Sequence, residues 1–183
     1  MSVGYGSNVG FDDDMIAEGE PEQEFNPGIA SRLPRKRVAG GVLFHDNDGR
    51  ILMVEPVYKP TWDIPGGLAE DDESPLAACR REVREEMRLD IEPGRLLVVD
   101  WIPRHGVWRD GVMFIFDGGM LTEDQLDAIA LQADELSSYK FVTVDEAADH
   151  VRPSLARRLR AAVAALESGI PAYLEFGRGQ SAS

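Results

Sequence analysis

Three glutamates stand within five consecutive positions of the stretch REVREEMRL, residues 81–89. Glu82, Glu85 and Glu86 alternate there with arginines, and Glu82 and Glu86 lie four residues apart. Like charges at that spacing destabilise a helix slightly. A divalent cation would turn this repulsion into attraction, because Mg²⁺ and Mn²⁺ prefer oxygen ligands such as carboxylates. The sequence therefore favours a metal site over the alternative, a solvated helix face joined by ion pairs.

A helix over residues 73–88 is predicted to hold these glutamates. Ser74 suits the N-cap and Pro75 the first helical position. Apolar side chains recur every three or four residues and form one buried stripe: Leu76, Cys79, Val83 and Met87. At about 100° per residue, the three glutamates fall in an arc of about 100° beside that stripe. Glu86 lies nearest the buried edge.

A tight turn, Pro65-Gly66-Gly67, precedes this helix and follows Trp62. Glycine there lets the backbone approach a ligand or metal closely. The stretch from Gly67 to Leu89 resembles the signature of the Nudix hydrolases, in which a glycine, a glutamate and a run of Arg-Glu-aliphatic-any-Glu-Glu keep fixed spacings. The matching residues are Gly67, Glu73, Arg81, Glu82, Val83, Glu85, Glu86 and Leu89.

Arg88 departs from this signature, because the family usually has a glycine at that position. The glycine permits the turn after the helix. Arginine enters a left-handed conformation at a cost of about 1 kcal/mol; alternatively, the helix continues to Leu89 and stops near Asp90. The departure leaves the carboxylates unchanged, so we expect metal binding to persist, although it leaves room for altered activity.

The resemblance implies an α/β fold, an α/β/α sandwich with a mixed β-sheet, over residues 38–168. Strand-like runs agree with this fold, and a turn, HDNDG, joins the first two. These runs cover residues 38–45, 50–57, 96–102, 112–119 and 139–144. A C-terminal helix is predicted over residues 152–169, with Ser154 as its N-cap and Gly169 at its end.

The two ends of the chain are predicted to lie outside this domain. Residues 1–37 form an acidic arm without periodicity that we expect to be partly disordered, and residues 169–183 form a tail.

Composition narrows the classes of function. A chain of 183 residues with a net charge of −14 lacks the basic footprint of a protein that binds a nucleic acid polymer. No apolar run is long enough for a membrane helix, and neither a secretory signal nor a second cysteine is present, so a cytoplasmic location is expected.

The resemblance implies hydrolysis of a diphosphate bond in a small phosphorylated substrate, a nucleoside diphosphate linked to another moiety, such as ADP-ribose, a nucleotide sugar or a dinucleotide. It assigns Mg²⁺ or Mn²⁺ to Glu82, Glu85, Glu86 and the Gly66 carbonyl. It gives Gly67, Glu73 and Arg81 a supporting role. The catalytic residues would be the same three glutamates together with Glu135, the candidate for a general base on a later loop.

Substrate recognition is predicted in the loop PRHGVWRDG, residues 103–111. Arg104, Trp108 and Arg109 offer an aromatic face for a base and cations for a phosphate. The alternative is an exposed hairpin tip.

Two other functions stay open, and a third does not. The chain could release pyrophosphate from nucleoside triphosphates, or it could be a non-catalytic module that binds nucleotides. An isoprenoid isomerase on the same fold is rejected, because the resemblance would then require a cysteine outside the glutamate helix, and Cys79 lies within it. Many similar proteins are homodimers, and the sequence is compatible with that state.

Overall fold

The computed structural model describes residues 14, 16, 18 and 23–179. The chain divides into two units, Met1–Arg35 and Lys36–Ser183, close to the predicted boundary after residue 37. The described part of the first unit includes a one-turn helix, α2 (Ile29–Arg32), without buried residues. Most of the predicted acidic arm, including residues 1–13, lies outside the described residues.

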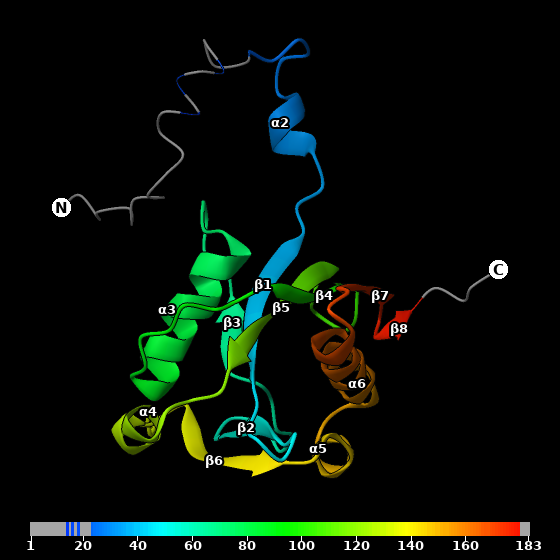
Figure 1. Cartoon of the computed structure of the whole chain (residues 1–183). Coiled ribbons are helices and arrows are strands. Elements are labelled where there is room, and N and C mark those ends of the chain that lie inside the picture. The colour runs from blue at the N-terminus through cyan, green and yellow to red at the C-terminus, as the bar shows by residue number, and fades with distance from the viewer. Residues whose placement is uncertain (1–13, 15, 17, 19–22, 180–183) are drawn as a thin grey trace. The chain divides into compact units, whose positions relative to one another are not determined.

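A mixed sheet forms the centre of the second unit (Figure 1). Its strands are β1 (Arg37–Phe44), β3 (Gly66–Leu68), β4 (Leu96–Ile102), β5 (Gly111–Gly119), β7 (Ala172–Glu175) and β8 (Arg178–Gly179). Their order in the sheet is β3-β1-β5-β4-β7-β8. The β1–β5 and β4–β7 pairs are parallel, and the other neighbours are antiparallel.

A second, two-stranded sheet pairs β2 (Ile51–Pro56) with β6 (Leu136–Val142) in antiparallel fashion. The predicted turn before β2 is present, with the main-chain N–H groups of Asp48 and Arg50 donating to Asp46 Oδ1 at 3.0 and 2.9 Å. However, β1 and β2 part after a single bridge between His45 and Ile51, so each strand joins a different sheet.

Helices cover both faces of the large sheet (Figure 1). The helix α3 (Pro75–Met87) packs on one face, where Val42 and Phe44 of β1 join its core. The helix α6 (Pro153–Ser168) packs on the other face, where Leu43 belongs to a second core. Since successive side chains of a strand point to opposite faces, β1 serves both cores. This arrangement confirms the predicted α/β/α sandwich.

The second unit also contains two short helices, α4 (Glu123–Ala128) and α5 (Val144–His150). Each begins with a threonine that forms a capping box with the residue three positions later. None of the described helices is both long enough and apolar enough to span a bilayer.

The C-terminal region differs from the prediction in two respects. Ser154 is not the N-cap of α6, because Pro153 already occupies the first helical position and Arg152 precedes it as the cap; the predicted end at Gly169 is confirmed. In addition, the chain returns to the sheet after residue 168, where β7 pairs with β4 and β8 with β7. The folded unit therefore extends beyond the predicted boundary.

A buried ion pair joins α6 to the sheet. Asp100 on β4 is fully buried and accepts hydrogen bonds from Arg158 of α6, at 2.7 Å from Nε and 2.6 Å from Nη2. The main-chain N–H of Gly177, in the turn between β7 and β8, donates to both carboxylate oxygens at 3.0 and 3.1 Å. One carboxylate thus holds three elements together.

Arg88 ends α3 in a left-handed conformation, with φ 59° and ψ 27°. Its main-chain N–H still donates to the carbonyl of Arg84, at 3.0 Å. The helix therefore ends at a left-handed Arg88, which was one of the two predicted alternatives, and does not continue to Leu89. The arginine makes the turn that the glycine of the signature would make.

Arg88→Gly is expected to stabilise the protein, because glycine adopts the left-handed conformation without the clash that a Cβ atom causes. We expect a gain of about 0.5–1 kcal/mol, or a melting temperature higher by about 1–4 °C, measured by thermal denaturation. Arg84→Gly, inside the same helix, is the matched control and should lower stability by about 1 kcal/mol. A lower melting temperature for Arg88→Gly would contradict this account.

Candidate metal centre

The helix α3 sets the exposure of the three glutamates. Its N-terminus is fixed by Ser74, whose hydroxyl accepts from the main-chain N–H of Ala77 at 3.1 Å. Its apolar stripe is buried against the sheet. As a result Glu86 is only 7% exposed, whereas the side chains of Glu82 and Glu85 are 17% and 51% exposed. The carboxylates therefore run from the core to the surface.

Arg81 joins the carboxylates around it. Its guanidinium forms two hydrogen bonds with Glu73, both at 2.9 Å, and Nη1 lies 3.0 Å from both Glu82 and Glu85. Nη2 also donates to the carbonyl of Leu68 at 2.9 Å. This hydrogen bonding lowers the pKa of Glu73 and raises that of Arg81. The arginine is thereby fixed between the turn and the helix.

The glycine turn lies directly against the helix. The main-chain N–H of Gly66 donates to Glu86 Oε2 at 3.0 Å, and Gly66 pairs with Gly41 of β1. A Cβ atom on Gly67 would lie 2.3 Å from the carboxyl carbon of Glu82, closer than any real contact allows. A side chain at position 67 would therefore displace this carboxylate from its present position.

Burial makes two of the carboxylates costly to ionise. It raises the pKa of Glu86 to about 8, against the opposing hydrogen bond from Gly66, and the charges of Glu82, Asp63 and Glu135 add to the increase. Burial also raises the pKa of Glu82, although Arg81 works in the opposite direction. Nearby positive charge would favour ionisation at both positions.

The stability of the metal-free protein is expected to fall with rising pH. Glu86 keeps its proton in the folded state to about pH 8, whereas the unfolded chain loses it near the ordinary value of 4.5. The stability contributed by the protonated form is thus complete below pH 4.5 and is lost as the pH rises through about 8. We expect the loss to be on the order of 1–3 kcal/mol.

Urea denaturation in a chelator, at about pH 5 and about pH 9, measures this loss. Glu86→Gln carries no titrating group at this position, so it should lose less stability between the two pH values than the unsubstituted protein. An equal loss in both proteins would contradict the raised pKa of Glu86.

Glu135 approaches the helix because its segment is bonded to the end of α3. The main-chain N–H groups of Ala130 and Gln132 donate to the carbonyls of Met87 and Glu86 at 3.1 and 3.0 Å. Glu135 is half-buried, and its charge raises the pKa of both Glu82 and Glu86. The structure thus brings the predicted base near the glutamates.

The donor chemistry of this cluster fits a hard divalent cation, since it combines several carboxylates with the main-chain groups of an adjacent glycine turn. Among the described residues, no three acidic, histidine or cysteine side chains converge as metal ligands in the present arrangement. Glu82 and Glu85 direct oxygens at Arg81 instead. Metal binding would therefore require these carboxylates to rotate from the guanidinium toward the cation.

Comparison with known proteins places this geometry in a family. The model of the NUDIX domain matches residues 34–165, which include every residue of the cluster described above. The chain belongs to the NUDIX family. The match also covers both helical layers and most of the sheet, so the family assignment rests on the whole domain.

Curated relatives of this NUDIX domain cover it only in part. The 8-oxo-dGDP phosphatase NUDT18 of Danio rerio is 36% identical over 105 residues, which are 52% of this chain and 30% of that protein. A MutT-like protein of Streptomyces ambofaciens is 33% identical over 82 residues, 45% of this chain and 49% of that one. This chain thus spans half or less of the length of these two relatives.

Solved structures share the fold. The MutT protein from Methanosarcina mazei Go1 superposes with a TM-score of 0.58 at 20% identity, covering 75% of this chain and 97% of that one.

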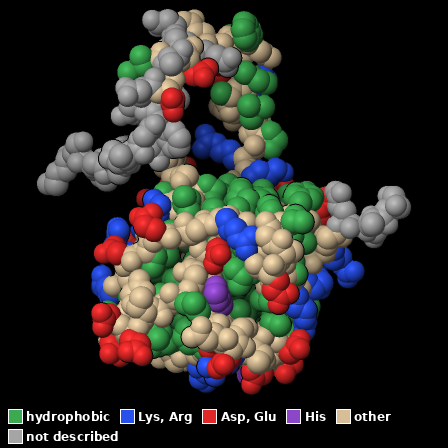
Figure 2. All heavy atoms as spheres, viewed as in Figure 1, with side chains coloured by type: hydrophobic (Ala, Val, Ile, Leu, Met, Phe, Trp, Pro, Cys, Tyr) green, Lys and Arg blue, Asp and Glu red, His purple; other side chains and the backbone are tan. Residues whose placement is uncertain are grey.

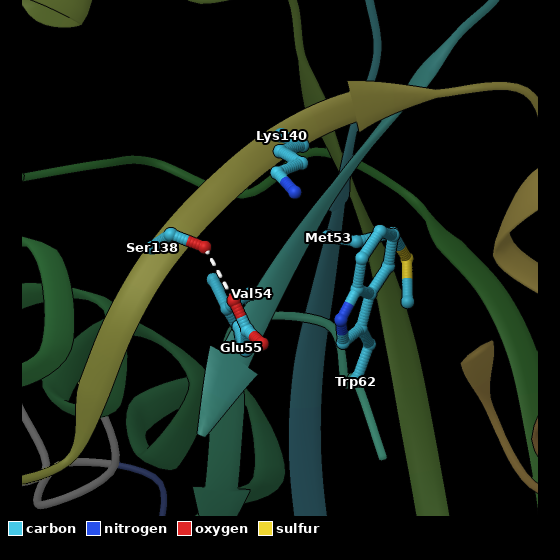
Figure 3. A pocket seen from close by; sticks show the side chains of 6 residues that line it. All are labelled: Met53, Val54, Glu55, Trp62, Ser138 and Lys140. Atoms are coloured by element: carbon cyan, nitrogen blue, oxygen red, sulfur yellow. Dashed lines mark hydrogen bonds between the residues drawn. The ribbon is translucent and has the colours of Figure 1, made fainter. Parts of the chain in front are cut away.

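A small pocket is lined by residues of β2 and β6 and by Trp62, which precedes the Pro65-Gly66-Gly67 turn (Figure 3). The ring of Trp62 stacks on His150 at 3.9 Å, and Lys140 Nζ lies 5.3 Å from the ring centre. Ser138 donates to Glu55 at 2.8 Å across the pocket. The pocket encloses essentially no volume, whereas ordinary small-molecule sites enclose several hundred Å³, so these contacts chiefly fix the segment that leads into Gly66.

The structure does not place the predicted substrate loop at the NUDIX glutamates. Trp108 lines a different cavity, to which α3 contributes no residue. Arg109 accepts a hydrogen bond through its carbonyl from Arg37, and neither Arg109 nor Arg104 lines that cavity. Substrate binding by these three residues stays a prediction.

Proposed function

We propose that the protein is a divalent-metal-dependent hydrolase that cleaves a diphosphate bond in nucleoside diphosphate derivatives. One observation carries this proposal: three glutamates are held beside the glycine turn. Arg81 donates to Glu82 and Glu85, and the main-chain N–H of Gly66 donates to Glu86. Membership of the NUDIX family supports it, as does a relative named for an 8-oxo-dGDP phosphatase activity.

The chain's own residues suit this chemistry. Glu82, Glu85, Glu86 and the Gly66 carbonyl would hold Mg²⁺ or Mn²⁺, which when bound neutralises the charge of a diphosphate and activates water. Arg81 and Glu73 orient the carboxylates, and Gly67 leaves room for Glu82. Glu135 would accept the proton of the attacking water, because it is half-buried beside this cluster and carries no cationic partner in the described contacts.

The left-handed conformation of Arg88 removes one argument for a non-catalytic module. A departure from the NUDIX signature at this position favours such a module only if it disturbs the end of α3. Since Arg88 makes the turn required after α3, the glutamates keep their places despite the substitution.

The test is a product analysis with a panel of substrates. The pure protein is incubated with Mg²⁺ or Mn²⁺ and with nucleoside diphosphates including 8-oxo-dGDP, ADP-ribose, nucleotide sugars, dinucleotides and nucleoside triphosphates, and products are separated by chromatography. We expect cleavage within the diphosphate group that depends on the metal and is lost in a chelator.

The products separate the alternatives. Two monophosphate products from ADP-ribose or a nucleotide sugar would support the proposal, whereas pyrophosphate released from triphosphates alone would indicate the triphosphate reaction. Metal-supported binding without turnover of any compound would indicate a non-catalytic module and overturn the proposed activity.

A further inference from the structure

A second, larger cavity lies at the start of α6, on the other face of the sheet from the glutamate helix. Its volume is about 520 Å³, within the range of about 300–1,000 Å³ that is typical of small-molecule sites. Four segments that are distant in sequence build it: the start of β1, the end of β4 with the loop after it, the first turns of α6, and the turn between β7 and β8.

Arginines dominate this cavity. Among the described residues, five arginines and no aspartate or glutamate line it: Arg37, Arg152, Arg157, Arg158 and Arg178. Within the part of the chain that the structure describes, Arg158 alone of the five has an acidic partner, the buried carboxylate of Asp100. Figure 2 shows Lys and Arg side chains gathered on the side of α6 and β8. In a protein with a net charge of −14, this concentration of positive charge marks a site for an anion.

The hydrogen bonds of these arginines leave their charges available. Arg37 and Arg157 donate to main-chain carbonyls, those of Arg109 and Phe176, at 2.8 and 2.7 Å. The Nε atom of Arg157 is buried without an acceptor among the described residues. The N-terminus of α6 adds the positive end of a helix dipole, and its cap residue, Arg152, makes no side-chain cap.

Aromatic side chains give the cavity a second kind of surface. Trp108 is 56% exposed and Phe176 is 39% exposed, although both line it. Each ring has a guanidinium nearby, Arg37 at 5.2 Å from Trp108 and Arg157 at 5.9 Å from Phe176. Exposed rings with adjacent cations are suited to stack on a nucleobase while the cations bind phosphates.

We propose that this cavity binds a nucleoside polyphosphate at a site separate from the glutamate cluster. The arginines bind the phosphates, and Trp108 or Phe176 stacks on the base. Its limited volume and the strongly acidic character of the rest of the protein favour a single nucleotide over a nucleic acid polymer. The proposal does not depend on the hydrolysis proposed above, because no residue of α3 takes part in this site.

Calorimetric titration of ATP in a chelator tests the proposal. Without a metal, the acidic cluster on α3 repels ATP, so any saturable binding reports the arginine cavity. We expect one site per chain, weakened at least tenfold by Arg152→Glu and by Arg178→Glu. Both positions are exposed, so these changes leave the core intact, which circular dichroism verifies.

Arg160→Glu is the matched control. Arg160 lies on the same helix and changes the net charge equally, but it pairs with Asp145 and does not line the cavity. We expect Arg160→Glu and Glu86→Gln to leave binding within about twofold of the unsubstituted protein.

Further outcomes of this titration test the kind of ligand, the role of the aromatic rings and the existence of the site. Tighter binding of ATP than of inorganic triphosphate, with no binding of adenosine alone, would support a nucleotide. Equal binding of ATP and triphosphate would overturn the role of the aromatic rings. Absence of saturable binding, or an equal loss in Arg160→Glu, would overturn the site.

Discussion

Glu86→Gln is expected to lower the turnover of the proposed hydrolysis by at least about 100-fold, while the protein stays folded. Glutamine keeps the shape of the side chain and can still accept the hydrogen bond from Gly66, but it brings no negative charge to a cation. Glu86 is the most buried of the three glutamates, so water cannot readily replace the lost ligand. Glu85→Gln is expected to act in the same direction.

The measurement is the initial rate at saturating metal and substrate, for whichever compound the panel identifies. Glu92→Gln is the matched control, because Glu92 is exposed, pairs only with Arg80 in the described contacts, and should keep full activity. Near-normal turnover in both Glu85→Gln and Glu86→Gln would refute the metal site. A comparable loss in Glu92→Gln would point to a general effect of charge.

Asp100→Ala is expected to destabilise the protein by about 3–5 kcal/mol. The substitution leaves the guanidinium of Arg158 buried without its counter-charge, and it also removes the acceptor of the Gly177 N–H. Since the carboxylate joins β4, α6 and the turn after β7, we expect urea denaturation to show a lower midpoint for the entire second unit. Loss of less than about 1 kcal/mol would mean that water or a neighbouring group replaces the carboxylate.

A double substitution separates the cost of the unpaired charge from the value of the ion pair. Asp100→Leu combined with Arg158→Met removes both charges and retains apolar volume, so it should recover much of the stability lost in Asp100→Ala. If the double variant is as unstable as the single one, the hydrogen bond to Gly177 is the dominant contribution.

Local patterns predicted the central elements well. The strand at residues 96–102 matches β4, and the other predicted strands overlap β1, β2, β5 and β6 within a few residues. Two of the helices that were not predicted, α4 and α5, carried a local signal, because Thr122 with Gln125 and Thr143 with Glu146 have the spacing of a capping box. The pairing of β7 with β4 had no such signal, since it joins residues about 75 positions apart.

The glutamate helix could be predicted because its glutamates, its cap and its apolar stripe all lie within one short segment. The arginine cavity could not be predicted from the sequence, because Arg37, Arg152 and Arg178 come from distant parts of the chain and lie together only in the folded unit. The stacking of Trp62 on His150 was hidden for the same reason. Sequence spacing reports contacts along one element, whereas these contacts depend on how the helices cover the sheet.

The contacts of Arg81 have a consequence for the choice of ion. In the metal-free protein its guanidinium already compensates Glu82 and Glu85, so an incoming cation must compete with an internal one. A monovalent ion such as Na⁺ or K⁺ brings no more charge than the guanidinium that it would displace, and it gains little by doing so. A small dication brings twice the charge. In the proposed metal site, Arg81 would thereby discriminate against the abundant alkali ions before any ligand geometry is considered.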